Sequence, residues 1–378
     1  MDAALPRLEI TAANVLSLCG GDGGRFRIHP IWLRERCQDP ESLDLKTGQR
    51  LHDPSDLPLD LALVAVSEPE SGRYHIRFSD GHEADFSGAE ILREYALAPG
   101  AHDTPPLRAW DGTLPALPRA HWPDQAVDAA RLETLELFLR YGFVILDGVP
   151  TAAGTVLEVA RAFGFTRATN FGDSFDVRST PEATDLAYTP VPLDAHTDNP
   201  YRDPVPSVQL LHCLVNQTTG GLSTLVDGFA VADSLRRRDP DAFSILTRTP
   251  VRFRYRDADT DLTASAVPIE LDAAGALRAI HFSPRLDFVP LGRPADLDAY
   301  YRARRSFDHL LRSTEFEIRF LLAAGELVMF DNRRLLHGRT GFNPAEGLRY
   351  LQGCYIDIDA PRSAWRVLRH RLRARTAP

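Results

Sequence analysis

The spacing of apolar residues divides the chain into a front part of short strands and a longer part that mixes strands with helices. Over residues 1–98, segments such as RFRIHPIWLR and RYHIRFSD alternate, or carry β-branched and aromatic residues between turn signals, which predicts short strands. Residues 99–123 hold six prolines and little periodicity. Because proline fixes φ and lacks a backbone N–H, this stretch is predicted to be an extended connector between two domains.

Residues 124–378 predict a larger domain of strands with helices outside them. Apolar residues recur at helical spacing through DQAVDAARLETLELFLRYG, and Gly142 is the expected stop. Further helices are expected within 155–164, 238–246 and 294–313, between strand-like segments such as SVQLLHCLV and GELVMFDN. The predicted fold is mostly β with flanking helices: a double-stranded β-helix (jelly roll) and a small β-rich N-terminal domain.

Composition and charge narrow the class of protein. The chain has 378 residues and a formal net charge of −9, with no basic stripe, so nucleic acid is a poor candidate partner. The basic C-terminal run RVLRHRLRART is interpreted as the solvated face of a terminal helix. No apolar run is long enough for a membrane span, and the N-terminus lacks the features of a secretory signal. Four scattered cysteines suggest no disulfide framework, so a cytoplasmic protein is expected.

Candidate chemistry lies in His196-Thr197-Asp198 and in the distant His337. Residues two apart in an extended segment point to the same face, so His196 and Asp198 can reach one point. Two imidazoles and one carboxylate form the facial triad of non-haem Fe(II) oxygenases, which leaves positions open for a co-substrate and O2. A His-x-Asp pair alone is weak, because the chain has 12 histidines and a hydrogen-bonded loop histidine is the alternative.

Arg349 strengthens the interpretation as an oxygenase. It follows His337 at the start of another predicted strand. A co-substrate with a distal carboxylate needs a fixed guanidinium near the metal, and arginine offers a bidentate partner. A surface ion pair is the alternative for this arginine, but its place after His-x-Asp and His favours the functional role.

The chain resembles the gamma-butyrobetaine hydroxylase and trimethyllysine hydroxylase family of 2-oxoglutarate oxygenases, within the TauD/TfdA-like superfamily. The similar segments are LAYTP, HTDNP, VQLLHCLVNQTTGGLSTLVDGF, FDNRRLLHGR and LQGCYID, with WLRERC, KTGQR and FSDGHEADF in the front domain. The resemblance covers nearly the whole chain, and its motifs occur in the family's order.

The resemblance implies an enzyme that uses Fe(II), 2-oxoglutarate and O2 to hydroxylate an unactivated C–H bond of a small cationic metabolite, with succinate and CO2 as co-products. It implies His196, Asp198 and His337 as iron ligands, Arg349 as the clamp for the distal carboxylate, and Ser223 as a hydroxyl near the co-substrate. Desaturation or rearrangement with the same cofactors stays open.

The resemblance also implies a substrate pocket with an aromatic cage for a trimethylammonium group, where cation–π attraction replaces hydrogen bonding. The aromatic residues at the matching positions are Phe171, Phe175, Tyr188 and Tyr355. Asn199 stands where butyrobetaine enzymes can carry another aromatic ring, and the nearby Tyr201 is expected to compensate. Core packing is the alternative for each ring.

Polar positions of the pocket depart from the butyrobetaine enzymes. Asp185 replaces an asparagine, and Ser283 with Pro284 replaces a second one. An aspartate repels a carboxylate and favours an ammonium group with N–H donors, so an amino-acid-like or amine-bearing substrate fits better than butyrobetaine. Arg285 could pair with an anionic end of the substrate. A strand-end cap is the alternative role for Asp185.

In the family, the small N-terminal domain binds structural zinc, and relatives suggest a homodimer. The matching positions are Cys37, Asp39, Ser42 and His82. Only Cys37 and His82 keep preferred ligand types, so Cys37, Asp39 and His82 are weak zinc candidates and zinc is not expected here.

Two other classes of function remain to be weighed. A non-catalytic binding protein on the same fold would not need a metal triad with open positions. A zinc hydrolase built on the same three ligands would lack a general base of the HExxH kind and would leave Arg349 without a role.

Overall fold

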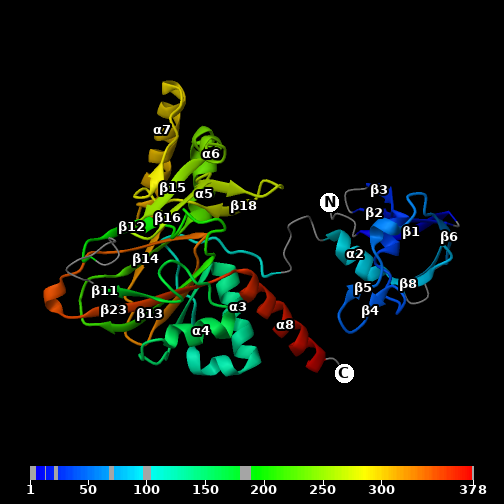
Figure 1. Cartoon of the computed structure of the whole chain (residues 1–378), viewed down its shortest axis with the longest axis horizontal. Helices are drawn as coiled ribbons and strands as arrows, with labels where there is room; N and C mark the ends of the chain where they lie inside the picture. Colours follow the sequence, from blue (N-terminus) through cyan, green and yellow to red (C-terminus); the bar gives the residue numbers. More distant parts are fainter. Residues whose placement is uncertain are drawn as a thin grey trace. The chain divides into compact units, whose positions relative to one another are not determined.

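The chain folds into two compact units, Met1–His102 and Asp103–Pro378. In the computed structural model, residues 6–12, 14–20, 24–67, 72–96, 104–178 and 189–376 are described. Strands predominate in both units, and the longer helices belong to the second unit (Figure 1). No described helix combines the length and apolarity that a membrane span would need. The structure is therefore mostly β with additional helices.

The first unit is built from short antiparallel strands, as their alternating sequences predict. Its sheets are β1 (Arg7–Ala12), β2 (Val15–Cys19) and β3 (Arg25–Arg27); β4 (Leu43–Asp44) and β5 (Gln49–Arg50); and β6 (Leu63–Val66), β7 (Arg73–Phe78) and β8 (Glu83–Ser87). The helices are α1 (Pro30–Arg34) and α2 (Gly88–Ala96). Period-two alternation along β7 buries Tyr74, Ile76 and Phe78, because successive side chains of a strand point to opposite faces. These residues join Leu16 and Leu33 in the core of this unit.

The zinc candidates of the first unit lie together. Ligand atoms of Cys37, Asp39 and His82 all lie within 4.8 Å of one another. The Nε2 atom of His82 is 2.9 Å from Asp39 Oδ2 and 3.3 Å from Ser42 Oγ. Arg34 completes the cluster, with Nη1 2.9 Å from Ser42 Oγ.

The donors of this cluster do not fit a structural zinc site. Such a site takes four ligands of the cysteine, histidine or carboxylate type, whereas the hydroxyl of Ser42 stands at the fourth position. Burial raises the pKa of the Cys37 thiol to about 11, although the charge of Arg34 opposes this, so the thiolate that binds metal is disfavoured. Hydrogen bonds among Arg34, Ser42, His82 and Asp39 satisfy these side chains without a metal.

The second unit is organised around two sheets. The six-stranded sheet has the order β11 (Phe175–Arg178), β23 (Arg349–Ile356), β13 (Val208–Asn216), β21 (Leu327–Asp331), β10 (Phe143–Asp147) and β9 (Arg119–His121). The four-stranded sheet has the order β12 (Leu193–His196), β22 (Leu335–Arg339), β14 (Ser223–Asp227) and β20 (Glu317–Phe320). All neighbouring strands are antiparallel except β9 and β10. Buried Phe143, Leu225, Ile318, Phe330 and Leu351, contributed by both sheets, form one shared core.

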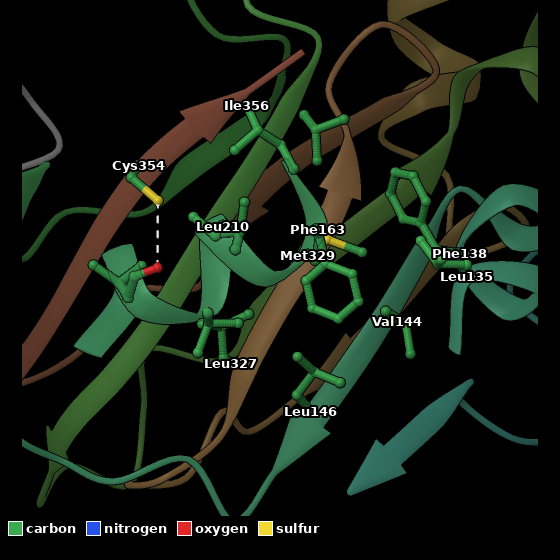
Figure 2. Packing of buried hydrophobic residues seen from close by; sticks show 14 of the residues in the cluster. Leu135, Phe138, Val144, Leu146, Phe163, Leu210, Leu327, Met329, Cys354 and Ile356 are labelled. Atoms are coloured by element: carbon green, nitrogen blue, oxygen red, sulfur yellow. Dashed lines mark hydrogen bonds between the residues drawn. The ribbon is translucent and has the colours of Figure 1, made fainter. Parts of the chain in front are cut away.

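Helices pack against the other face of the six-stranded sheet. They are α3 (Asp128–Tyr141), α4 (Thr155–Phe163) and α8 (Asp359–Thr376), and Figure 1 shows them on one side of the second unit. Figure 2 shows Phe138 of α3 and Phe163 of α4 meeting Leu210 and Met329 of the sheet. The predicted end of α3 is confirmed, since Gly142 adopts a left-handed φ of 80° that favours glycine.

A second layer of elements covers the four-stranded sheet and extends from it. It contains α5 (Gly228–Arg238), α6 (Pro240–Leu246) and α7 (Pro294–Leu311), with the short strands β15 (Val251–Arg256), β16 (Asp261–Ala266), β17 (Ile269–Leu271), β18 (Leu277–Ile280) and β19 (Asp287–Phe288). Their apolar faces form a separate core that includes Val231, Phe253, Ile280 and Phe307. This layer contains Tyr255 on β15, which contacts Phe171, and the fully buried Ser283.

Residues 104–123, predicted as part of a connector, are built into the second unit. Trp110 is only 5% exposed and its indole N–H donates to the Tyr141 carbonyl at 2.8 Å. Further along, β9 pairs with β10 in the six-stranded sheet. The proline content does predict irregular backbone, but the apolar side chains between the prolines bury themselves against the sheet.

A fully buried ion pair joins this segment to both sheets. Arg334 and Asp227 have side chains that are 2% and 0% exposed, and their closest atoms lie 2.6 Å apart. The remaining guanidinium donors reach the carbonyls of Arg140 and Arg108 at 2.8 and 2.7 Å. The backbone N–H of Trp110 donates to Asp227 Oδ2 at 3.2 Å. Besides the bonds between the two side chains, the pair contacts the main chain at Arg140, Arg108 and Trp110, so it fixes where these segments meet.

The buried pair generates a stability prediction. Replacing Arg334 with methionine would leave the Asp227 carboxylate buried without its cation, which we expect to lower the free energy of unfolding by about 3–5 kcal/mol. Arg293 pairs with Asp296 at the surface and is 84% exposed, so Arg293→Met should cost less than about 1 kcal/mol. Urea denaturation followed by circular dichroism measures both. Similar losses in the two variants would contradict a structural role for the buried pair.

The cluster in the first unit generates a metal-binding prediction. In a His337→Ala background, which disables the other metal cluster, the protein should hold far less than one equivalent of zinc by elemental analysis. Adding Asp39→Cys and Ser42→Cys should raise this to about one equivalent, because four zinc-type ligands are then present. If the background protein already holds one equivalent and Cys37→Ser removes it, the cluster is a zinc site as it stands.

Candidate active site

Three side chains from the four-stranded sheet and the loop beyond it converge on one point. His196 ends β12 and pairs in register with His337 on the neighbouring β22, and their rings lie 4.4 Å apart. Asp198 follows His196 by two residues. The potential ligand atoms of the three residues all lie within 4.8 Å of one another. The spacing of His196 and Asp198 and the strand position of His337 therefore bring together the residues that the sequence indicated.

A hydrogen bond orients the His196 ring toward the common centre, whereas His337 Nδ1 is buried without a partner among the described residues. The Nδ1 atom of His196 lies 2.9 Å from the Asp194 carbonyl, which only accepts, so Nδ1 carries the proton and Nε2 is left as a metal ligand. This Nε2 atom is 3.3 Å from Asp198 Oδ1, and His337 Nε2 is 3.8 Å from Asp198 Oδ2. The carboxylate thus lies between the two imidazoles.

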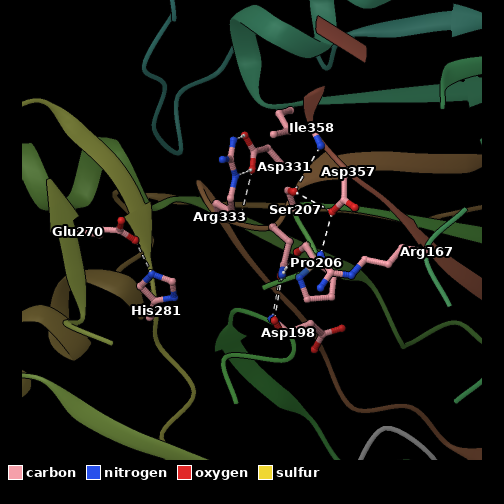
Figure 3. A network of polar contacts seen from close by, with 11 residues as sticks. Arg167, Asp198, Pro206, Ser207, Glu270, His281, Asp331, Arg333, Asp357 and Ile358 are labelled. Carbon is pink, nitrogen blue, oxygen red and sulfur yellow. Dashed lines mark hydrogen bonds and ion pairs between the residues drawn. The ribbon is translucent and has the colours of Figure 1, made fainter. Parts of the chain in front are cut away.

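The main chain of Asp198 is fixed by the side chain of Asn332. The Asn332 carbonyl accepts from the Asp198 N–H at 2.7 Å, and its amide donates to the Asp198 and Pro206 carbonyls at 2.9 and 3.0 Å. Asn332 is fully buried in the turn between β21 and β22. Figure 3 shows Asp198 and Pro206 within the same polar network as the ion pair of Arg167 with Asp357. The loop after the ligand is therefore held at both ends.

Electrostatics at the cluster favours the protonation states that metal binding needs. Burial alone would raise the pKa of the Asp198 carboxyl, but His337, His196 and a hydrogen bond from Tyr355 lower this pKa well below its usual range. Burial lowers the pKa of the His337 imidazole to about 3, although Asp198 opposes the shift. Burial and the Asp198 carboxylate raise the pKa of the Tyr355 phenol well above its usual value. The result is an anionic carboxylate, a neutral imidazole and a phenol that remains a donor.

A cavity of about 90 Å³ extends from the cluster to two further predicted residues, Ser223 and Arg349. Arg349 is 6% exposed, and its Nε atom has no hydrogen-bond partner among the described residues. Gly221 has a φ of 66°, and a Cβ atom there would lie 2.8 Å from Arg349 Nε, so glycine is needed beside the guanidinium. A buried cation without its counter-charge is costly, which indicates that an anionic ligand belongs at this end of the cavity.

A continuous set of aromatic rings reaches the metal cluster through Phe175, which lines the same cavity, and Tyr355, which bonds Asp198. Phe175 lies 5.4 Å from Tyr355 and 6.3 Å from Phe171. Phe171 lies 5.5 Å from Tyr255, which stacks on Tyr201 at 5.1 Å. The structure therefore brings four predicted aromatic residues together, with Tyr255 as an addition from β15.

The remaining predicted pocket residues differ in how the structure places them. Asn199 has a left-handed φ of 54°, and its side-chain carbonyl accepts from the Tyr201 hydroxyl. Ser283 is fully buried, and its hydroxyl has no partner among the described residues. Arg285 is exposed, and its charge contributes to lowering the pKa of His337. Asp185 and Tyr188 lie outside the described residues.

Three residues that contribute to the site were not singled out from the sequence. Asn332 stands in the FDN segment, where its amide could have been recognised as a partner for buried main chain. Gln209 lines the cavity from β13, and its side-chain carbonyl is buried without a partner among the described residues. Tyr255 lies on a strand of the outer layer, and no local signal in VRFRYR links it to the distant Phe171.

The donor set fits iron. Two imidazole nitrogens and one carboxylate on one side of a metal leave the other side open, as in the facial triad of non-haem Fe(II) oxygenases. The guanidinium of Arg349 lies in the same cavity; Nη2 donates to the Gly221 carbonyl at 3.3 Å and Nε has no partner among the described residues, which fits a co-substrate with a second carboxylate. These residues would hold iron and 2-oxoglutarate.

Comparison with known proteins gives matches over both units. The family model "Taurine catabolism dioxygenase TauD, TfdA family" matches residues 110–355, and "Gamma-butyrobetaine hydroxylase-like, N-terminal" matches residues 10–93. The gamma-butyrobetaine dioxygenase of Pseudomonas sp. (strain AK-1) is 37% identical over 92% of each chain. The human gamma-butyrobetaine dioxygenase is 30% identical over 96% of each chain. The trimethyllysine dioxygenase of Meyerozyma guilliermondii is 26% identical over 90% of this chain and 89% of that relative.

These matches extend over nearly the full length of the chain and include the His196, Asp198 and His337 cluster. They agree with the resemblance found in the sequence motifs and with the donor set of the cavity. The chain therefore belongs to the TauD, TfdA family of 2-oxoglutarate-dependent dioxygenases.

Proposed function

We propose that this dioxygenase hydroxylates an unactivated C–H bond of a small cationic metabolite and releases succinate and CO2. The observation that carries the proposal is the placement of His196, Asp198 and His337 in one cavity with the buried guanidinium of Arg349, whose Nε atom has no hydrogen-bond partner among the described residues. When bound there, iron supplies the activation of O2 that is coupled to the oxidative decarboxylation of 2-oxoglutarate. The larger unit would then be a double-stranded β-helix, with the reaction between its two sheets.

The co-substrate end of the cavity supports a dicarboxylate. Burial lowers the pKa of Arg349, yet an arginine remains a cation in proteins, so its charge needs a partner. The distal carboxylate of 2-oxoglutarate would take the free edge of the guanidinium beside Gly221, with the hydroxyl of Ser223 nearby. The same arrangement excludes water from the charge pair and fixes the direction in which the co-substrate approaches the metal ligands.

The aromatic set supports a cationic substrate. Phe171, Phe175 and Tyr355 present ring surfaces beside Asp198, and Tyr201 and Tyr255 extend the array. Ring faces attract a cation that cannot donate hydrogen bonds, such as a quaternary ammonium group. The names of the gamma-butyrobetaine and trimethyllysine dioxygenases agree with such a substrate.

The polar residues beside the rings indicate how the rest of the substrate would be held. The hydroxyl of Ser283 and the side-chain carbonyl of Gln209 are buried and lack partners among the described residues. Each such group costs about 1–3 kcal/mol unless a ligand or water satisfies it. A substrate with hydrogen-bonding groups of its own, such as an amino acid or an amine-bearing betaine analogue, would meet this need. Asp185 is proposed to favour an N–H donor and Arg285 an anionic end.

The proposal predicts a coupled reaction. Protein loaded anaerobically with Fe(II) and 2-oxoglutarate should, on admission of O2, form succinate in step with one member of a cationic panel that gains one oxygen atom. The panel contains trimethyllysine, butyrobetaine, their less methylated amines and aminophosphonates, and mass spectrometry reads both products. A product that loses two hydrogens instead would indicate desaturation. Succinate that never exceeds the substrate-free background would refute a cationic substrate from this panel.

Arg349 gives a second prediction. Replacing Arg349 with methionine should raise the KM for 2-oxoglutarate by about 30-fold or more, because a buried charge pair loses about 2–5 kcal/mol when one partner is removed. Arg319 pairs with Glu317 and is 54% exposed, so Arg319→Met serves as the matched control with an unchanged KM. Steady-state succinate assays at varied 2-oxoglutarate measure both. An unchanged KM for Arg349→Met would show that the co-substrate binds elsewhere.

A further inference from the structure

Tyr355 connects the aromatic wall of the pocket directly to a metal ligand. It lies near the end of β23, is 3% exposed, and its hydroxyl donates to Asp198 Oδ2 at 2.9 Å. Its ring packs against Phe175 at a centroid distance of 5.4 Å and an interplanar angle of 30°. A single side chain therefore contacts both the residues that would face the substrate and the carboxylate that would bind iron.

The Tyr355 hydroxyl bonds the side-chain carboxylate of Asp198, whose main chain is already fixed. Asn332 bonds both the N–H and the carbonyl of Asp198, so the backbone of this residue is fixed. Rotation about the side-chain bonds remains, and this rotation decides which carboxylate oxygen faces the imidazoles. Oδ1 lies 3.3 Å from His196 Nε2, whereas Oδ2 accepts the bond from Tyr355. The hydroxyl thus selects one orientation of the carboxylate.

The main chain of Tyr355 is fixed in its sheet, and its ring packs against Phe175. Tyr355 pairs in register with Gln209 of the neighbouring strand β13, and its backbone carbonyl accepts from the Arg167 N–H at 2.8 Å. Gly353, two residues earlier on the same strand, leaves the space that the Phe175 ring fills, since a Cβ atom at Gly353 would lie 2.4 Å from that ring. Phe175 therefore packs against Tyr355, and a displacement of one ring displaces the other.

We propose that Tyr355 is a positioning residue that couples the occupancy of the aromatic pocket to the orientation of the Asp198 carboxylate. The inference rests on the proposed function, because it assumes that the rings face the substrate and that Asp198 binds iron. A cation that binds against the rings of Phe175 and Tyr355 changes the position of the Tyr355 hydroxyl. The hydrogen bond to Asp198 changes with it. Metal geometry then responds to whether a substrate is present.

Replacing Tyr355 with phenylalanine removes the hydroxyl and keeps the ring. Partners that orient metal ligands are worth about 10- to 100-fold in metal affinity, so the dissociation constant of Co(II), used as a spectroscopic probe for Fe(II), should rise by about this factor. The visible bands of bound Co(II) should also shift, because the carboxylate is free to rotate. The addition of substrate should change these bands in the wild-type protein and much less in Tyr355→Phe.

Tyr350 offers a matched control on the same strand. Its hydroxyl donates to Asp176 Oδ1 at 2.9 Å, away from the metal ligands, so Tyr350→Phe removes an equivalent hydrogen bond. It should leave the Co(II) affinity and bands as in the wild type. If Tyr355→Phe does not fold, 3-fluorotyrosine at position 355 keeps the shape and strengthens the donor. The bands should then move in the direction opposite to that expected for a weaker bond.

The outcomes separate this inference from the proposed function. If the wild-type protein fails to bind Co(II) at the cluster, the proposed function itself falls. If the wild type binds Co(II) and forms succinate with a substrate, but Tyr355→Phe matches it in affinity, bands and response to substrate, the coupling through Tyr355 is disproved alone. If Tyr355→Phe and Tyr350→Phe lower the Co(II) affinity by the same factor, the Tyr355 hydrogen bond contributes to stability alone and does not orient the metal ligand.

Discussion

The ion pair between Arg334 and Asp227 is the contact on which the second unit depends. Asp227 ends β14 and its carboxylate also accepts from the Phe229 N–H, which begins α5. Arg334 lies in the turn that leads from β21 to β22. Two residues before it, Asn332 holds the main chain of Asp198, and three residues after it, His337 faces the same centre. A charge pair removed from water thus sets the turn from which the metal ligands are positioned.

The site combines residues that are satisfied with residues that are not. His196 and Asp198 are held by hydrogen bonds to the Asp194 carbonyl, Asn332 and Tyr355, whereas His337 Nδ1 is buried without a partner among the described residues. Arg349 Nε and Gln209 Oε1, which line the cavity, are buried without partners among the described residues. Side chains with all their hydrogen bonds made resist movement. Buried polar groups without partners lower the stability of the folded protein until a ligand bonds to them. A site that binds a co-substrate and a substrate needs rigid metal ligands. It also needs buried polar groups that are still free to bond the two molecules.

Much of the site could be predicted because its signals are local or follow from strand geometry. His-x-Asp on an extended segment places two ligands on one face, and the motif series extends this to His337 and Arg349. Tyr255 and the bond from Tyr355 to Asp198 could not be predicted, since they depend on how an outer layer and two sheets pack in space. Composition also misjudged residues 104–123, where prolines indicate irregular backbone but cannot reveal that Trp110 is buried. Local chemistry is readable in the chain, whereas contacts between distant layers are not.

The hydrogen-bonded cluster of Arg34, Ser42, His82 and Asp39 has a consequence for how the protein matures. A domain held by a structural metal is folded only after that metal is delivered, because binding energy and folding energy are then the same quantity. Here the first unit completes its core with side chains that every newly made chain already carries. With the cluster free of zinc, as the metal-binding prediction expects, the folding of the first unit would not wait for delivery of that metal.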